Sequence, residues 1–389
     1  MAYIPYGRQS ISEDDVRAVA EVLRSDFLTQ GPAVPAFEEA VKSHCGAAHA
    51  VAVNSATSAL HLACLALDIG TDDLVWTSPV TFVASANCVL YCGARVDFVD
   101  IDPKTLNISV EKLASKLDRT ARAGEKLPKA VIAVDMCGQS CDMAAIHALA
   151  ERYGFKVIED ASHAVGGRYR NHPVGNCQYS DIVIFSFHPV KIITTGEGGM
   201  ALTNAPDLAK KMQLLRSHGI TRDTSEMTSP SEGAWYYQQI ALGFNYRMTD
   251  IQAALGSSQM RHLEEWVSRR HVLAAQYDEA LARLPLILPR QHHDTYSAWH
   301  LYVIQVSDEA PMSRSEMFAA LRSDGIGVNV HYIPVHMQPF YRKLGFKPGD
   351  FPAAEDYYSR AISIPMYSSM SDPDQRFVID QISNRCARS

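Results

Sequence analysis

Short apolar runs alternate with amphipathic stretches along the first half of the chain. A short apolar run is typical of a buried strand, whereas apolar positions that repeat every three to four residues are typical of a helix. Helical patterns fill most gaps between the runs, for example at residues 58–67, 82–91 and 142–153. The apolar runs predict strands at residues 49–54, 74–77, 95–99, 130–134, 156–159, 182–185 and 200–203. This repeated order predicts an α/β protein with a mainly parallel, seven-stranded sheet that helices cover on both faces.

Two predicted helices begin with capping signals. Ser12 is followed three residues later by the acidic Asp15, which predicts a first helix at residues 12–24. Thr249 and the glutamine three residues after it form the same pattern. They predict one long helix that runs toward Leu281 and links two parts of the chain.

The second half of the chain has a mixed pattern. Strands are predicted at residues 300–306 and 328–331, after a polar loop. We therefore predict two domains. Residues 1–255 form a large cofactor-binding domain with an N-terminal arm at 1–11, and residues 256–389 form the linking helix and a smaller C-terminal α/β domain.

Composition narrows the classes of function. The chain has 389 residues, of which 47% are hydrophobic and 20% charged, as in ordinary globular proteins. Its net charge of −7, without a basic block, argues against nucleic-acid binding. No apolar run approaches the roughly 18 residues that span a membrane, and the start lacks a signal pattern. We expect a cytoplasmic protein that is not attached to a membrane.

The cysteines and histidines predict no metal site. Cys88 and Cys92 are four residues apart, as are Cys137 and Cys141, which is not the spacing of common zinc sites. The sequence contains no H-E-x-x-H motif, and no G-x-G-x-x-G motif follows a strand. A dinucleotide cofactor is therefore disfavoured as well.

Lys191 is the most informative candidate for chemistry. The strand at 182–185 leads into Ser186, and Lys191 follows five residues later, before a turn rich in threonine and glycine. An amine in a largely apolar site can be kept neutral by desolvation, and a neutral amine can attack an aldehyde. This pattern suits pyridoxal phosphate, an aldehyde cofactor. Considered alone, a lysine near a turn is more often a surface residue.

A second strand ends in an acid that suits the same cofactor. The strand at 156–159 leads into Asp160, and a buried carboxylate would keep the ring nitrogen of pyridoxal phosphate protonated. Glu159 is the competing acid. We prefer Asp160 because it is nearer the strand end and because His163 follows within one turn.

A third strand leads into a helix start that suits a phosphate group. Ser55, Ala56 and Thr57 stand between the strand at 49–54 and an alanine-rich helix. Free N–H groups and the positive end of the helix dipole favour an anion there. Ser186 could donate its hydroxyl to the same phosphate.

Taken together, these segments resemble one enzyme family. Over essentially its whole length the chain resembles the pyridoxal phosphate-dependent sugar aminotransferases of the DegT/DnrJ/EryC1/StrS family. Within it, the chain is most similar to enzymes of the pseudaminic acid pathway, which aminate C4 of a UDP-linked 4-keto-6-deoxy-N-acetylhexosamine. The motifs are Tyr6-Gly-Arg, Asp26-Phe-Leu-Thr-Gln-Gly31, Asn54-Ser-Ala-Thr-Ser-Ala-Leu60, Thr81-Phe-Val-Ala84, Glu159-Asp-Ala-Ser-His163, Ser186-Phe-His-Pro-Val-Lys191, Gly243-Phe-Asn-Tyr-Arg247 and His331-Tyr-Ile-Pro334.

The resemblance implies a fold and a set of roles. The implied fold is that of aspartate aminotransferase (fold type I), with L-glutamate as the amino donor. The implied catalytic residues are Lys191, Asp160 and His163. The implied cofactor contacts are Lys191, Asp160, His163, Ser186, Ala56, Thr57, Phe82 and Asn245. The implied sugar-nucleotide cleft contains Tyr6, Asp26, Phe27, Leu28, Thr29, Ser55, Asn245, Arg247, His331, Tyr332, Ile333 and Pro334.

Two of these residues have roles that depend on the resemblance alone. From the pattern, Phe82 begins a helix and is more often an ordinary core residue, whereas the resemblance implies stacking on the cofactor ring. Asn245 reads as a turn residue before a helix cap. The resemblance implies that it reaches the cofactor of a neighbouring subunit, and hence a homodimer with shared active sites.

Three alternatives stay open at this point. An aminotransferase for another nucleotide-linked keto sugar, with a dTDP or GDP carrier or with amination at C3, would keep the same cofactor residues. A sugar 3-dehydratase of the same fold has a histidine in place of Lys191, which counts against it. A catalytically silent sugar-nucleotide-binding regulator is disfavoured by the intact Lys191, Asp160 and Ser186.

Overall fold

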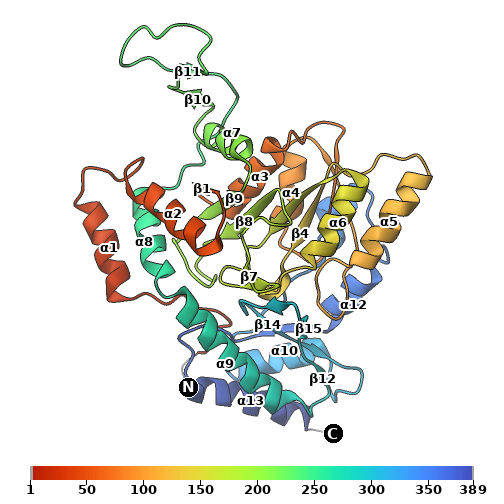
Figure 1. The fold of residues 1–389 in the computed structure, drawn as a ribbon. Coiled ribbons are helices and arrows are strands. Elements are labelled where there is room, and N and C mark those ends of the chain that lie inside the picture. The colour runs from red at the N-terminus through yellow and green to blue at the C-terminus, as the bar shows by residue number, and fades with distance from the viewer. Residues whose placement is uncertain (1–2, 388–389) are drawn as a thin grey trace.

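A seven-stranded sheet forms the centre of the computed structural model, which describes residues 3–387 (Figure 1). Its strands are β1 (His49–Val53), β2 (Leu74–Thr77), β3 (Arg95–Phe98), β4 (Ala130–Val134), β5 (Lys156–Asp160), β8 (Ile182–Ser186) and β9 (Gly199–Thr203). They follow the spatial order β1–β9–β8–β5–β4–β2–β3. Strand β9 is antiparallel to both neighbours, and the other neighbouring pairs are parallel. The predicted mainly parallel sheet is confirmed.

Helices cover both faces of this sheet. They are α2 (Ala33–Cys45), α3 (Ala56–Ala66), α4 (Ala84–Tyr91), α5 (Val110–Arg122), α6 (Met143–Tyr153) and α7 (Pro206–Arg216). In β8, Ile182 and Ile184 pack in the same cluster as residues of α3, α4 and α7. Val183 and Phe185 pack on the opposite face, in a cluster with α2. Because both faces are buried, most of the strands are continuous apolar runs, whereas the edge strand β3 alternates between polar and apolar residues.

Two of the predicted helices begin at other residues than expected. The helix predicted from residue 58 begins at Ala56, because Ser55 caps it by accepting a hydrogen bond from the Ser58 N–H. The helix predicted from Phe82 begins at Ala84, so Phe82 belongs to the preceding connection. Ser55 and Phe82 therefore lie in the connections between strand and helix, at the edge of the sheet.

The predicted long helix from Thr249 to Leu281 is wrong, since the structure has two helices there. They are α8 (Asp250–Met260), which Thr249 caps as predicted, and α9 (Leu263–Leu281). Between them the Arg261 N–H donates to the Ser258 carbonyl and the His262 N–H to the Gln259 carbonyl. These bonds span three residues instead of four and tighten the turn, so the helix axis is interrupted. Helix α8 packs against α2 and against α1 (Glu13–Leu23), the first predicted helix with its Ser12–Asp15 capping box.

A second, antiparallel sheet lies on the C-terminal side of the chain. Its strands are β12 (Leu286–Ile287), β14 (Tyr302–Val306) and β15 (Ala361–Ile364), and its core is shared with α9, α10 (Arg314–Ser323) and α13 (Asp372–Cys386). The predicted strand at 328–331 is wrong. Only Asn329 forms a bridge there, to Ser363, and the chain then leaves the sheet. The division predicted between residues 255 and 256 falls within α8 and stays a prediction.

The remaining elements are short, except for one projecting segment. Residues 220–243, which we call the arm, extend away from the sheet and include β10 and β11 (Figure 1). No helix within residues 3–387 combines the length and the apolar character needed to cross a bilayer. The short elements are β6 (Arg168–Tyr169), β7 (His172–Pro173), β10 (Ile220–Thr221), β11 (Gln238–Gln239), β13 (Thr295–Tyr296), η1 (Met136–Gly138), η2 (Val335–Met337), α11 (Pro339–Arg342) and α12 (Pro352–Arg360).

Candidate active site

The strand ends of the large sheet bring the predicted residues to one edge. Asp160 is the last residue of β5 and Ser186 is the last residue of β8, and these two strands are parallel neighbours. Strand β1 runs in the same direction as β8, because both are antiparallel to β9. Its continuation, Ser55, therefore reaches the same edge. Sites in sheets of this type lie at the carboxyl ends of the strands.

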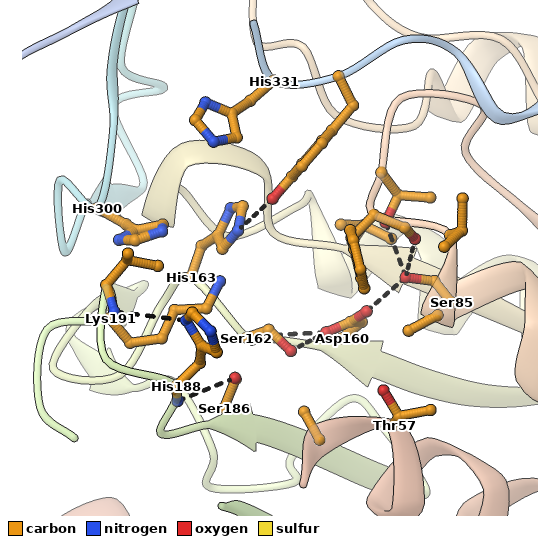
Figure 2. A pocket seen from close by; sticks show the side chains of 18 of the residues that line it. Thr57, Ser85, Asp160, Ser162, His163, Ser186, His188, Lys191, His300 and His331 are labelled. Atoms are coloured by element: carbon orange, nitrogen blue, oxygen red, sulfur yellow. Dashed lines mark hydrogen bonds between the residues drawn. The ribbon is translucent and has the colours of Figure 1, made fainter. Parts of the chain in front are cut away.

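A cavity of about 690 Å³ opens at this edge. Figure 2 shows Lys191, Asp160 and Ser186 directed into it from three segments of the chain. The predicted site residues that line it are Tyr6, Ser55, Ala56, Thr57, Phe82, Asp160, His163, Ser186, Lys191, His331, Tyr332 and Ile333.

Lys191 lies on the loop that joins β8 to β9, residues 187–198, which we call the lysine loop. The loop is fixed at both ends, since the Phe187 N–H donates to the Gly198 carbonyl at 2.9 Å and the Thr195 N–H donates to the Phe187 carbonyl at 3.0 Å. Burial lowers the pKa of Lys191 to about 8, and the negative charge of Asp160 opposes part of this change. About half of the amine is therefore available as a neutral nucleophile or base near pH 8.

Three buried histidines surround the lysine without adding positive charge. Burial lowers the pKa of His331 to about 4, and it lowers the pKa values of His163 and His300 well below the ordinary range, with Lys191 adding to each effect. The His163 and His300 ring centroids lie 4.4 Å apart. His163 Nε2 lies 3.2 Å from the Tyr332 hydroxyl. These neutral rings can donate or accept hydrogen bonds inside the cavity.

Asp160, and not Glu159, faces the cavity. Successive side chains of β5 point to opposite faces of the sheet. Glu159 accepts a hydrogen bond from the Ser180 hydroxyl at 2.6 Å, and burial raises its pKa. Asp160 accepts hydrogen bonds from the Ser162 and Ser85 hydroxyls at 2.5 and 2.6 Å. A carboxylate held in this way is suited to keep a proton on a nitrogen in the cavity.

The start of α3 provides donors for a phosphate group. Ser55 takes up the Ser58 N–H, which leaves the Ala56 and Thr57 N–H groups of the first turn for another acceptor. Gly199 lies against this turn, and a Cβ atom on it would stand 2.5 Å from the Ala56 nitrogen. Only glycine permits this close approach. The Ser186 hydroxyl lines the same cavity, so the helix start and the end of β8 can bind one anion together.

Phe82 and Tyr332 provide the aromatic surface of the cavity. The Phe82 side chain is 58% exposed, and its ring centroid lies 6.2 Å from that of Tyr332. An aromatic side chain that lines a cavity while remaining so exposed is available to stack on a planar ligand. The ordinary core position that the pattern alone favours for Phe82 is therefore wrong.

Several predicted cleft residues do not line this cavity. They are Asp26, Phe27, Leu28, Thr29, Asn245, Arg247 and Pro334. The Leu28 carbonyl accepts a hydrogen bond from the Asp250 N–H, which fixes that segment at the start of α8. The Asn245 carbonyl accepts a hydrogen bond from the Asn54 side chain at 3.4 Å, and the Asn245 side chain is exposed. Within one chain these residues are displaced from the cavity.

Eight polar residues that line the cavity are not among the predicted site residues. They are Thr81, Ser85, Ser162, His188, Glu197, His300, Asn329 and Gln338. Ser162 had a usable signal, because a serine two residues after an aspartate commonly bonds to it in a turn. His300 had none, since a histidine before an apolar strand is common. Ser85 lies 75 residues from Asp160, and only the sheet order brings the two together.

The residues present fit pyridoxal phosphate. The cavity contains one lysine amine for an aldehyde, Lys191, and its buried carboxylate, Asp160, suits a ring nitrogen, whereas the second carboxylate, Glu197, is exposed. The N–H groups of Ala56 and Thr57 and the Ser186 hydroxyl suit the phosphate, and Phe82 suits the ring. His163 Nδ1 is buried without a hydrogen-bond partner in the described chain, as expected for a polar wall that faces a ligand or water.

Comparisons with known proteins agree with this chemistry. The DegT/DnrJ/EryC1/StrS aminotransferase family model matches residues 9–383. The spore coat polysaccharide biosynthesis protein SpsC of Bacillus subtilis is 44% identical over 98% of this chain and 96% of its own. The UDP-4-amino-4,6-dideoxy-N-acetyl-beta-L-altrosamine transaminase of Campylobacter jejuni is 38% identical over 97% of this chain and 96% of its own.

The fold comparison gives a similar result. The structure of Helicobacter pylori PseC, an aminotransferase involved in the biosynthesis of pseudoaminic acid, is 30% identical in sequence. It superposes with a TM-score of 0.89 over 99% of both chains.

Proposed function

The chain belongs to the DegT/DnrJ/EryC1/StrS aminotransferase family and is a pyridoxal phosphate-dependent transaminase of fold type I, and on this premise we propose its substrates. The proposed amino donor is L-glutamate. The proposed acceptor is a UDP-linked 4-keto-6-deoxy-N-acetylhexosamine, aminated at C4 as in pseudaminic acid biosynthesis. The observation that carries the proposal is that one cavity is lined by Lys191, Asp160 and Ser186 and also by Tyr6 and His331, which the resemblance assigns to the sugar-nucleotide cleft.

Bound pyridoxal phosphate supplies an aldehyde for covalent attachment and a conjugated ring that withdraws electrons from the carbon losing a proton. Lys191 would hold the cofactor through its amine. When glutamate occupies the site, the freed and neutral Lys191 amine would take the proton from the α-carbon of glutamate, and later it would return a proton to C4 of the sugar. A pKa of about 8 lets one amine perform both transfers near neutral pH.

The other cavity residues hold the reactants in place. Asp160 is proposed to keep the ring nitrogen protonated through its negative charge. Ala56, Thr57 and Ser186 are proposed to bind the phosphate, and Phe82 to lie against the ring. His163 lines the same cavity, with its imidazole within hydrogen-bonding distance of Tyr332, and is proposed to contact the ring.

We propose a homodimer that completes each site from its partner. The cleft residues Asp26–Thr29, Asn245 and Arg247 line no part of their own chain's cavity. Large apolar side chains are exposed in the same regions, with Phe27 at 53% and Trp235 in the arm at 72%. Exposed apolar groups of this size are typical of a protein–protein interface. A two-fold dimer would make the exchange reciprocal.

We also propose that the enzyme works in the cytoplasm. The proposal rests on its substrates, because glutamate and nucleotide sugars are metabolites of that compartment.

A substrate panel tests the proposed acceptor. Purified enzyme is incubated with L-glutamate and with UDP-, dTDP- or GDP-linked 4-keto-6-deoxy sugars, and both 2-oxoglutarate and the amino sugar are measured by mass spectrometry. We expect the amino sugar from the UDP-linked N-acetylhexosamine. Amination of dTDP- or GDP-linked sugars alone, or at C3, would favour another nucleotide-sugar aminotransferase. The panel includes these other sugars because one relative of this chain is named for spore coat polysaccharide biosynthesis.

A further inference from the structure

A chain of buried hydroxyl groups ends on Asp160. The Ser85 hydroxyl lies 2.6 Å from Asp160 Oδ2, and the Thr81 hydroxyl lies 2.7 Å from that of Ser85 (Figure 2). On the other carboxylate oxygen, Oδ1 accepts from the Ser162 hydroxyl at 2.5 Å and from the Ser162 N–H at 3.2 Å. Thr81 and Ser85 are almost completely buried. Water therefore does not compete for these hydrogen bonds.

The direction of these hydrogen bonds follows from the number of protons that each group can donate. An ionised carboxylate can only accept, so Ser85 donates its single hydroxyl proton to Asp160. The Phe82 carbonyl is a weaker competitor for this proton, because it lies 3.4 Å from the Ser85 oxygen and is uncharged. Thr81 must then donate to Ser85. Each donor polarises the next, so the hydroxyl of Thr81 strengthens the bond between Ser85 and Asp160.

One of the four hydrogen-bond acceptor sites of the Asp160 carboxylate is left unoccupied. A carboxylate has about four lone-pair sites, two on each oxygen. Ser162 occupies both sites of Oδ1, and Ser85 occupies one site of Oδ2. The remaining site belongs to Oδ2, on a residue that lines the cavity. A ring N–H in the cavity would therefore share Oδ2 with Ser85.

We infer that Ser85, oriented by Thr81, is a positioning residue for the transamination: it fixes Asp160 Oδ2 toward the ring nitrogen of the cofactor and disperses the negative charge of that oxygen. The inference rests on the role proposed for Asp160. Thr81 directly precedes Phe82, and Ser85 follows it in the first turn of α4, so this connection and the helix start together hold the aromatic residue and the acid.

The test compares isosteric changes with and without the hydroxyl group. Ser85→Ala removes the donor to Asp160. Thr81→Val removes the second hydroxyl and keeps the shape, and Thr81→Ser keeps the hydroxyl and serves as the conservative rescue. Thr77→Val is the matched control, because Thr77 lies on the strand just before this connection and its buried hydroxyl donates to the Ile132 carbonyl at 2.9 Å.

Two readouts are measured on each purified holoenzyme. The first is the pH at which the visible absorption band of the bound cofactor changes. Ser85→Ala should raise this midpoint by at least about 0.3 pH units, because a less dispersed charge on Asp160 stabilises a nearby cation more strongly. The second is the rate, for which we expect a loss of about 10- to 100-fold in kcat with a change in the KM for glutamate below about threefold.

The pattern across the variants decides the inference. Thr81→Val should shift both readouts in the same direction by a smaller amount, and Thr81→Ser and Thr77→Val should match the wild type. The double variant Ser85→Ala/Thr81→Val should equal Ser85→Ala, because Thr81 acts only through Ser85. A purely structural role would not move the absorption midpoint of the bound cofactor in this pattern.

Several results would overturn it. An unchanged absorption midpoint and kcat in Ser85→Ala, additive effects in the double variant, or the same shift in Thr77→Val would each do so. If Ser85→Ala does not fold, the Thr81→Val and Thr81→Ser pair gives the answer alone. A wild-type protein that binds the cofactor but does not aminate the UDP-linked sugar would refute the proposed substrate only and leave this test intact.

Discussion

The rate at which apo-enzyme captures its cofactor should depend on pH through the ionisation of Lys191. Burial lowers the pKa of this amine from 10.5 to about 8. At pH 8 about half of the Lys191 amine is therefore neutral, whereas only about 0.3% of a lysine with the ordinary pKa is neutral. Because a neutral amine is required for attack on an aldehyde, ionisation alone should make capture by Lys191 about 150-fold faster at this pH.

The assay mixes apo-enzyme with pyridoxal phosphate at pH values from about 6 to about 10 and follows the new absorption band. Reduction with borohydride and peptide mass analysis then locate the attachment. The rate should rise about tenfold per pH unit up to about pH 8 and then level off. Nα-acetyl-lysine in the same buffers controls for ionisations of the cofactor, and its rate should still rise at about pH 10. An enzyme rate that follows the free lysine would refute a desolvated Lys191.

The effect of the Asp160 charge on the pKa of Lys191 can be tested in the same assay. Asp160 raises the pKa of Lys191 against the effect of burial. Replacing it by asparagine removes that attraction, so the levelling-off point should move to lower pH. A move to higher pH would mean that Asp160 does not act on the amine through its charge.

Three further predictions concern individual residues. Lys191→Ala should abolish turnover while its thermal unfolding by circular dichroism resembles that of the wild-type apo-enzyme, and near-normal turnover would contradict the assignment. Asp160→Asn should lower kcat at least about 10- to 100-fold, from the loss of a charged hydrogen bond of about 1.5–3 kcal/mol, whereas Glu159→Gln on the opposite face of the strand should not; the reverse result would identify Glu159 as the acid. Asn245→Ala should weaken cofactor retention on dialysis by about 1.5–3 kcal/mol. Mixing Asn245→Ala with Lys191→Ala chains should partly restore activity after subunit exchange, and a monomer, or exchange without recovery, would exclude a shared site.

The sheet could be predicted because its strands are local apolar runs. Apart from the edge strand β3, the strands of the large sheet are buried on both faces, so no partner has to be known to recognise them. The break between α8 and α9 could not be predicted, because Arg261 and His262 are residue types that are common within helices. It arises where α8 packs on α1 and α2 while α9 packs on α13. The strand predicted at 328–331 also depends on distant contacts. Of this segment only Asn329 pairs with β15, whose other edge pairs with β14.

The residues of the candidate site also fall into two groups, those that a local pattern predicts and those that it does not. Asp160 and Ser186 could be predicted because they end buried strands, and Lys191 because it follows at a family-like spacing. Ser85 and His300 reach the cavity only through sheet order and packing between distant segments. Polar residues in such positions carry no local pattern, so a sequence motif cannot distinguish them from ordinary surface residues.

The antiparallel strand β9 affects how fast the Lys191 amine can move between the cofactor and a substrate carbon. Because β9 returns beside β8, the lysine loop begins and ends at the same edge of the sheet, with Phe187 bonded to both Gly198 and Thr195. Its backbone is a fixed pivot for the long, flexible lysine side chain. Moving the amine between the cofactor and a substrate carbon then needs only rotations about side-chain bonds, which take picoseconds to nanoseconds where the surroundings allow them. Loop motions are slower, so the reassignment of this amine should not limit the rate of turnover.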